Sequence, residues 1–182
     1  MNVINGDLPG TLIIEPKVFG DARGWFLETW NAARYRAAGL SLDFVQDNVS
    51  FSRHGILRGL HFQNPNPQGK LVMALRGEVL DVVVDLRRSS PTFKRWQAVR
   101  LSGESKRQFY VPPGLAHGFV VLSDEAVFQY KCTALYSPSD EQTLRWDDPE
   151  LGIDWGICDP ILSAKDAGAR RLSEIPPDKL YP

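Results

Sequence analysis

Short apolar runs, separated by Gly, Pro, Asn and Asp, follow one another along most of this chain. The runs are rich in β-branched and aromatic residues, and their lengths are those of strands rather than helices. They predict strands over residues 71–75, 79–86, 96–101, 108–111, 119–122, 126–133 and 142–146. Many short strands between turn residues indicate an all-β fold, and we expect a jelly-roll sandwich or barrel. Such a barrel has a mouth in which small ligands bind.

Helices are expected to be few, short and peripheral. Asn31 is a favourable cap for a helix that runs through Ala38, and Gly39 is a suitable stop. Near the end of the chain, the run from Ser163 to Asp166 resembles a helix-capping sequence, with an acidic residue three places after the serine. These two segments complete the expected secondary structure.

Composition narrows the class of protein further. The chain has 182 residues, 43% of them hydrophobic, and a formal net charge of −1, which predicts one globular domain over residues 1–182. The charge balance predicts no nucleic-acid surface, and no apolar run approaches the ~20 residues that span a bilayer. The first residues lack the features of a signal peptide, and Cys132 and Cys158 alone make no disulfide framework. We therefore expect a cytoplasmic protein whose two thiols are buried or neutral.

The chain has only three histidines, His54, His61 and His117. Around His61 a fixed cation, Arg58, and a glycine, Gly59, lie within four positions of the imidazole. Taken alone, this pattern favours a buried histidine with satisfied hydrogen bonds beside a surface arginine, because paired groups are often structural.

His117 follows Pro112 and Gly114 at a spacing that resembles the second sequence motif of the cupin superfamily, in which a turn presents a histidine at the barrel mouth. The alternative is an ordinary Pro-Gly turn with a nearby imidazole. The first cupin motif, with its His-x-His pair, is missing, and His61 is one imidazole where a metal site needs several ligands. We therefore predict a barrel without metal, with a metal-binding cupin as the alternative.

Alternation along residues 126–133 places Phe128, Tyr130 and Cys132 on one face of a strand. That face is the more apolar, so Tyr130 should point into the barrel. Its hydroxyl is either the hydrogen-bonded tip of a core residue or a proton donor. The charged residues Arg23, Glu28, Arg58, Lys70 and Asp166 have no such signal, since isolated charges are usually solvated.

Taken together, ordered segments from about residue 10 to residue 170 resemble the dTDP-4-dehydrorhamnose 3,5-epimerase family, a branch of the cupin superfamily. No single motif carries the resemblance; their order and coverage do. The matching segments are residues 21–28, 44–50, 58–63, 68–72, 81–87, 113–119, 130–133, 136–138, 146–149 and 162–166.

The resemblance implies a homodimeric cupin jelly roll that epimerises a dTDP-linked keto sugar and needs no cofactor or metal. It implies that His61 is the base, Tyr130 the acid, and Asp166 the partner that orients His61. Lys70 would lie near the ketone oxygen, and Tyr136 would stack on thymine. The remaining pocket residues implied are Arg23, Glu28, Gln46, Asp47, Asn48, Arg58, His117, Glu141 and Lys165.

One detail conflicts with regular strand geometry. In an unbroken strand Arg58 and His61 point to opposite faces, although the resemblance places both on the ligand. Either Gly59 marks a bulge that re-aims one side chain, or the ligand is reached from a partner subunit.

Three other functions stay open. They are an epimerase that acts at one carbon only, a metal-dependent cupin enzyme, and a sugar-binding module without turnover. The presence of His61, Tyr130 and Asp166 together argues against the binding module, because a binder needs no acid–base pair.

Overall fold

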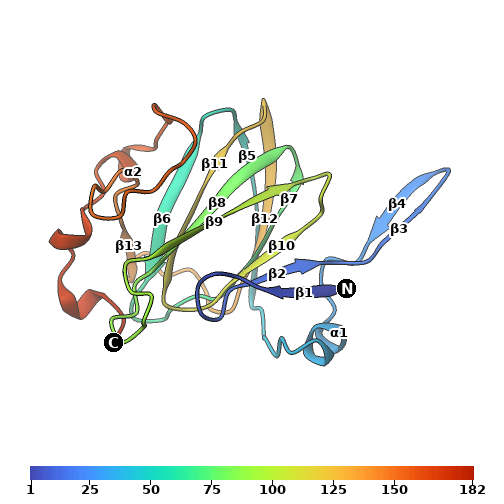
Figure 1. Cartoon of the computed structure of the whole chain (residues 1–182), viewed down its shortest axis with the longest axis horizontal. Helices are drawn as coiled ribbons and strands as arrows, with labels where there is room; N and C mark the ends of the chain where they lie inside the picture. Colours follow the sequence, from blue (N-terminus) through green and yellow to red (C-terminus); the bar gives the residue numbers. More distant parts are fainter.

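The computed structural model describes residues 1–182 as two antiparallel sheets packed face to face, with the C-terminal segment along one side (Figure 1). One sheet has six strands in the order β1-β2-β10-β7-β12-β5, and the other has five in the order β13-β6-β11-β8-β9. This is the all-β jelly-roll sandwich that the pattern predicts. The strands of the two sheets are β1 (Asn2–Asn5), β2 (Leu12–Glu15), β5 (Gln46–Arg53), β6 (Leu57–Gln63), β7 (Lys70–Arg76), β8 (Glu78–Asp85), β9 (Trp96–Ser102), β10 (Gln108–Val111), β11 (Leu115–Val121), β12 (Glu125–Cys132) and β13 (Glu141–Thr143).

A separate two-stranded hairpin, β3 (Val18–Asp21) and β4 (Gly24–Leu27), projects away from the sandwich (Figure 1). Its large apolar side chains are exposed; Trp25 is 59% and Phe26 67% accessible. Lys106 of the sandwich lies over the Trp25 ring, with Nζ 4.3 Å from the ring centroid. The hairpin therefore extends a hydrophobic surface that the rest of the chain leaves uncovered.

Strands predicted from apolar runs are present, and β10 has the predicted bounds. β11 begins at Leu115, earlier than the predicted residue 119, and so includes His117. β13 is shorter than its prediction. The sequence pattern missed β1 to β6, and the reason is clearest for β5. Its inward positions carry polar side chains: Gln46, Asn48 and Ser50 line a cavity instead of the core, and the buried Ser52 accepts a hydrogen bond from Arg58.

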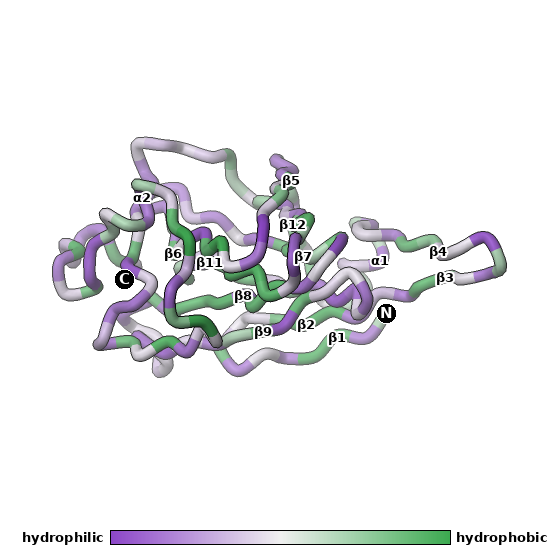
Figure 2. The backbone as a smooth tube through the Cα atoms, turned by 90° about the horizontal axis from the view of Figure 1, so that it is seen from above, coloured by the Kyte–Doolittle hydropathy of each residue, from purple (hydrophilic) through white to green (hydrophobic).

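The core lies between the two sheets, and β8 of the five-stranded sheet, which contributes several buried residues to it, is drawn in hydrophobic colours (Figure 2). Phe119 and Phe128 stack across it with centroids 4.3 Å apart. A second cluster packs the C-terminal segment, including the fully buried Trp155, against β6 and β8. These contacts hold the segment after β13 against the sandwich, and this segment includes the short helix that carries Asp166.

The helices are short and lie outside the sheets, as predicted. In α1 (Ala32–Ala37) the Asn31 side chain caps the helix by accepting from the Arg34 N–H at 3.1 Å, and Gly39 follows with φ 92°. In α2 (Ala164–Ala167) the Ser163 hydroxyl caps the helix by accepting from the Asp166 N–H at 3.1 Å. Two 3₁₀ turns follow, Leu172–Glu174 and Pro177–Lys179. None of these helices has the length and apolar character needed to cross a membrane.

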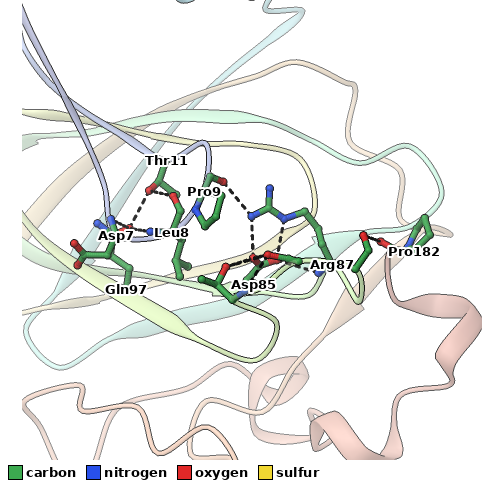
Figure 3. A network of polar contacts seen from close by, with 11 residues as sticks. Asp7, Leu8, Pro9, Thr11, Asp85, Arg87, Gln97 and Pro182 are labelled. Carbon is green, nitrogen blue, oxygen red and sulfur yellow. Dashed lines mark hydrogen bonds and ion pairs between the residues drawn. The ribbon is translucent and has the colours of Figure 1, made fainter.

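A buried polar network ties the end of β8 to the N-terminal loop (Figure 3). The Asp85 carboxylate, which is fully buried, accepts hydrogen bonds from Arg87, Ser90 and Thr92. Arg87 also donates to the Pro9 carbonyl at 3.0 Å. Burial alone would raise the pKa of Asp85, but these hydrogen bonds outweigh burial and lower the pKa to about 2.

Replacing Asp85 by asparagine is therefore expected to reduce stability at neutral pH. A carboxyl whose pKa falls from 3.8 to about 2 on folding contributes roughly 2 kcal/mol above the unfolded value. That contribution is lost as the pH falls from about 4 through 2. Urea unfolding of wild type and Asp85→Asn, measured from pH 6 downwards, should show two stabilities that converge in acid. A constant difference at all pH values would contradict this account.

Candidate active site

A cavity of about 560 Å³ opens between the two sheets. Strands β5, β6, β7, β11 and β12 form its walls, and residues between 136 and 166, from β13, α2 and the loops beside them, form its rim. The wall mixes aromatic rings with convergent polar groups, as small-molecule sites usually do. The candidate residues on this wall are Gln46, Asn48, Arg58, His61, Lys70, His117, Tyr130, Tyr136, Glu141, Lys165 and Asp166.

His61 on β6 pairs with Asp166 on α2, although 105 positions separate them in sequence. His61 Nε2 and Asp166 Oδ1 are 2.6 Å apart, and Asp166 is only 3% exposed. The second carboxylate oxygen, Oδ2, accepts from the Ser163 hydroxyl at 2.9 Å. Burial opposes ionisation of Asp166, but the hydrogen bonds from His61 and Ser163 and the charge of His61 lower its pKa overall. The carboxylate is therefore both held in place and kept ionised.

This geometry determines which atom of His61 is free. An ionised carboxylate can only accept, so the hydrogen between the two groups belongs to Nε2. In the neutral ring, Nδ1 then carries a lone pair and makes no hydrogen bond within the chain. His61 lines the cavity, so it offers a base to whatever is bound there.

Tyr130 and Lys70 lie on neighbouring strands of the opposite sheet, and neither the phenol nor the ammonium has a hydrogen-bond partner in the chain. Burial raises the pKa of Tyr130 and lowers that of Lys70. Cys132 is buried on the same inward face as Tyr130, which confirms the predicted alternation of this strand. Cys158, by contrast, is exposed rather than buried.

A β-bulge brings Arg58 and His61 to the same cavity. On β11, His117 pairs with His61 and Phe119 pairs with Arg58, so two steps on β11 match three steps on β6. Gly59 has φ 128°, and a Cβ there would lie 2.5 Å from the Cα of Gly118. Only glycine allows this close approach of the two backbones. Of the two explanations left open by the sequence, the bulge is therefore present.

Polar groups at the cavity rim are linked to one another. Glu141 Oε2 accepts from both the Tyr136 hydroxyl and Lys165 Nζ, each at 3.0 Å. The Tyr136 N–H donates to Gln46 Oε1 at 2.8 Å, and Gln46 donates in turn to Asn48 at 3.0 Å. The Tyr136 ring, which is half exposed, is thus held at the rim where a planar base can stack on it.

His117 is paired with Asp81, a residue that the sequence did not identify as a candidate. Its Nε2 lies 2.8 Å from Oδ2 of Asp81, which is fully buried on β8. A signal was available, because Asp81 and Asp85 are the two charges inside the apolar run of residues 79–86. The structure contains no group of three or more His, Cys, Asp or Glu side chains placed to hold a metal ion.

Three residues implied by the resemblance lie outside this cavity. Arg23 is at the exposed tip of the β3–β4 hairpin, paired with Asp21, because the hairpin projects away from the sandwich. Glu28, just after the hairpin, pairs with Arg34 at 3.1 Å. Asp47 has the opposite alternation to its neighbours on β5, so it points outward and pairs with Lys131 at 2.7 Å. Within one chain these three do not reach the ligand site.

Comparison with known proteins gives consistent matches. The family model described as dTDP-4-dehydrorhamnose 3,5-epimerase matches residues 5–174. A curated dTDP-4-dehydrorhamnose 3,5-epimerase from Methanothermobacter thermautotrophicus is 52% identical over 176 residues, 95% of either chain. The structure of dTDP-6-deoxy-D-glucose-3,5-epimerase from Legionella pneumophila in complex with dTDP-4-keto-L-rhamnose matches with TM-score 0.96 and 51% identity, covering 99% of this chain and 97% of that one. A 3'-monoepimerase from Streptomyces bikiniensis in complex with dTDP-quinovose matches with TM-score 0.86 and 37% identity, covering 92% of this chain and 86% of that one.

Proposed function

Because this chain belongs to the dTDP-4-dehydrorhamnose 3,5-epimerase family, we propose that it inverts C3 and C5 of dTDP-4-dehydro-6-deoxy-D-glucose to form dTDP-4-dehydro-L-rhamnose. Members of this family are isomerases that act on a nucleotide sugar in dTDP-L-rhamnose synthesis, and this chain is an enzyme of that class. The main support for assigning the catalytic base to a particular residue is the His61–Asp166 pair on the cavity wall.

The chemistry requires a base that removes a proton from a carbon next to the C4 ketone. His61 Nδ1 takes that proton, and the ring becomes an imidazolium whose charge Asp166 stabilises at 2.6 Å. The electron pair left on carbon moves to the ketone oxygen and forms an enolate. Lys70, whose ammonium has no partner in the chain, stabilises the negative charge on that oxygen.

Inversion also requires a proton donor on the opposite face of the sugar ring. Tyr130 is on β12 of one sheet, whereas His61 is on β6 of the other, so the two side chains approach the cavity from opposite walls. The Tyr130 phenol donates its proton to the enolate carbon, which leaves a phenolate on Tyr130 and an imidazolium on His61. Exchange with solvent returns a proton to Tyr130 and removes one from His61, so the same cycle can act at C3 and at C5 and give the doubly inverted product. The other candidates bind and orient the nucleotide sugar: Gln46, Asn48, Arg58, His117, Tyr136, Glu141 and Lys165.

We further propose that the enzyme works as a homodimer in which the β3–β4 hairpin enters the partner's site. The hairpin carries Arg23 and leads into Glu28, the two implied ligand contacts that the single chain places away from its own cavity. The exposed Trp25 and Phe26 supply an apolar surface of the kind that marks interfaces. We assign the enzyme to the cytoplasm, whose reducing conditions suit two free cysteines.

Complementation between two inactive variants tests the shared site. Arg23→Ala should bind substrate poorly and His61→Asn should lack the base, so each homodimer should be nearly inactive. When the two are unfolded, mixed and refolded, a mixed dimer has one site with both Arg23 and His61 intact. Random pairing then restores about a quarter of wild-type activity. No recovery, with dimers present by sedimentation, would mean that Arg23 does not act across the interface.

The function itself is tested by supplying dTDP-4-dehydro-6-deoxy-D-glucose to the purified enzyme in D₂O. The proposal expects deuterium at both C3 and C5 of the product, detected by NMR. Label at one carbon only would indicate a single-carbon epimerase, an activity named for the Streptomyces bikiniensis relative. Loss of turnover with a chelator, restored by a metal, would indicate a metal-dependent enzyme instead. Binding without any exchange would indicate a sugar-binding module.

A further inference from the structure

The cavity contains a second buried His–Asp pair beside the first. His117 and His61 are directly opposite each other on β11 and β6, and both line the cavity. Each ring uses Nε2 to contact one buried carboxylate, Asp81 in one case and Asp166 in the other. Asp81 has no place in the mechanism described above, and it touches the cavity only through His117.

Burying Asp81 inside the protein reduces the stability of the fold. It is fully buried, its Oδ2 contacts His117, and its Oδ1 has no hydrogen-bond partner. A buried carboxylate with an unpaired oxygen reduces stability unless nearby charges compensate for the loss of water. Burial raises the pKa of Asp81, and the charge and hydrogen bond of His117 and the charge of Lys70 oppose that rise. A residue that serves only the fold would be better replaced by an apolar one.

The contact decides which nitrogen of His117 faces the ligand. An ionised carboxylate only accepts, so the hydrogen between the two groups is on Nε2. Nδ1 then makes no hydrogen bond within the chain, while the ring lies on the cavity wall. In the neutral ring Nδ1 is an acceptor, and the hydroxyl groups of a hexose are the donors that a nucleotide sugar offers there.

We propose that Asp81 is a positioning residue that holds the proton of His117 on Nε2, so that Nδ1 accepts a hydrogen bond from a hydroxyl group of the bound hexose. This inference rests on the proposed function and extends it, since it assigns one contact by which the enzyme distinguishes a nucleotide sugar from the bare nucleotide.

Asp81→Asn tests the inference while changing little in shape. An asparagine offers Nε2 either its amide oxygen or its NH₂ group, so it no longer fixes the ring proton on Nε2, and part of the His117 population carries that proton on Nδ1. The acceptor is lost in that part of the population, and affinity for dTDP-quinovose should fall by up to about 10-fold, the effect of one hydrogen bond. Affinity for dTDP, which has no hexose, should not change. The unfolding temperature should not fall, because the substitution removes a buried charge with an unpaired oxygen.

Asp85→Asn is the matched control. Asp85 is the other fully buried aspartate on β8, but its partners are Arg87, Ser90 and Thr92 instead of a histidine. This variant should lose stability and keep the wild-type ratio of dTDP-quinovose to dTDP affinity. An equal change in that ratio for both variants would overturn the inference, because it would reflect a general disturbance of β8.

A spectroscopic measurement on the wild-type enzyme makes the inference independent of the variants. With only three histidines, ¹⁵N-labelled imidazoles can be assigned one by one in two-bond ¹⁵N–¹H correlations. We expect His117 to be protonated at Nε2 alone in the wild type, and partly at Nδ1 in Asp81→Asn. A His117 ring protonated at Nδ1 in wild type overturns the inference, as does unchanged selectivity in Asp81→Asn.

The outcomes also separate this inference from the proposed function. Wild-type turnover with equal losses of dTDP and dTDP-quinovose affinity in Asp81→Asn would leave the function intact and overturn the contact to the hexose. A wild-type enzyme that neither binds nor converts a dTDP-linked sugar would overturn both.

Discussion

Replacing His61 by asparagine should lower the rate of epimerisation by about 10²–10⁴-fold, the usual cost of losing a general base. Asparagine has no lone pair of comparable basicity, so neither the C3 nor the C5 proton can be removed. Exchange of both hydrogens with solvent deuterium should therefore disappear together. The measurement is the NMR signal of these two positions when the substrate is incubated with the variant in D₂O.

His54 provides the control for this experiment. It is an exposed histidine outside the cavity, and its ring lies near the Leu122 carbonyl. His54→Asn should exchange both positions at the wild-type rate. If His61→Asn also exchanged them at nearly that rate, another group would be the base and the role of Asp166 would have to be reassigned.

Replacing Tyr130 by phenylalanine should separate proton removal from inversion. The base on the opposite wall remains, so deuterium still enters the substrate. The proton donor for the second face is gone, and inversion at both C3 and C5 should slow by about 10²–10⁴-fold. The Tyr130 hydroxyl has no partner within the chain, so its loss should leave the unfolding temperature nearly unchanged. Product stereochemistry and deuterium content, read from the same NMR samples, supply both rates.

Tyr110 is the matched tyrosine for this test. It is buried on β10 and does not line the cavity, so Tyr110→Phe should affect neither exchange nor inversion. Equal losses of exchange and inversion in Tyr130→Phe would contradict a role for Tyr130 as the donor on the second face. That result would place Tyr130 in substrate binding instead.

Local rules predicted those parts of the fold that depend on near neighbours. Apolar runs of strand length indicated most of the core strands, and alternation along β12 correctly placed Tyr130 and Cys132 inside. The caps at Asn31 and Ser163 were readable because a capping side chain reaches only two or three residues along the chain.

Local rules failed where a strand faces the cavity. The inward positions of β5 are polar, so the segment has no apolar stripe and was not predicted. β6 was missed for a related reason, since Gly59 and His61 interrupt its hydrophobic pattern. Prediction from the hydrophobic and polar pattern assumes that side chains pointing into the protein are apolar, and this assumption does not hold beside a ligand site.

The sequence by itself determined the all-β class, the inward face of β12, and, through resemblance, the family and the residues worth testing. It did not determine the site, because the pairing of His61 with Asp166 joins residues 105 positions apart and depends on how the C-terminal segment packs against β6. The bulge that brings Arg58 beside His61 depends on the contact between Gly59 and Gly118 of another strand. Only the tertiary structure shows the Asp81–His117 pair and the distance of Arg23 from its own cavity. The physical reason is common to all four: each depends on contacts between segments far apart in the chain, which no local pattern specifies.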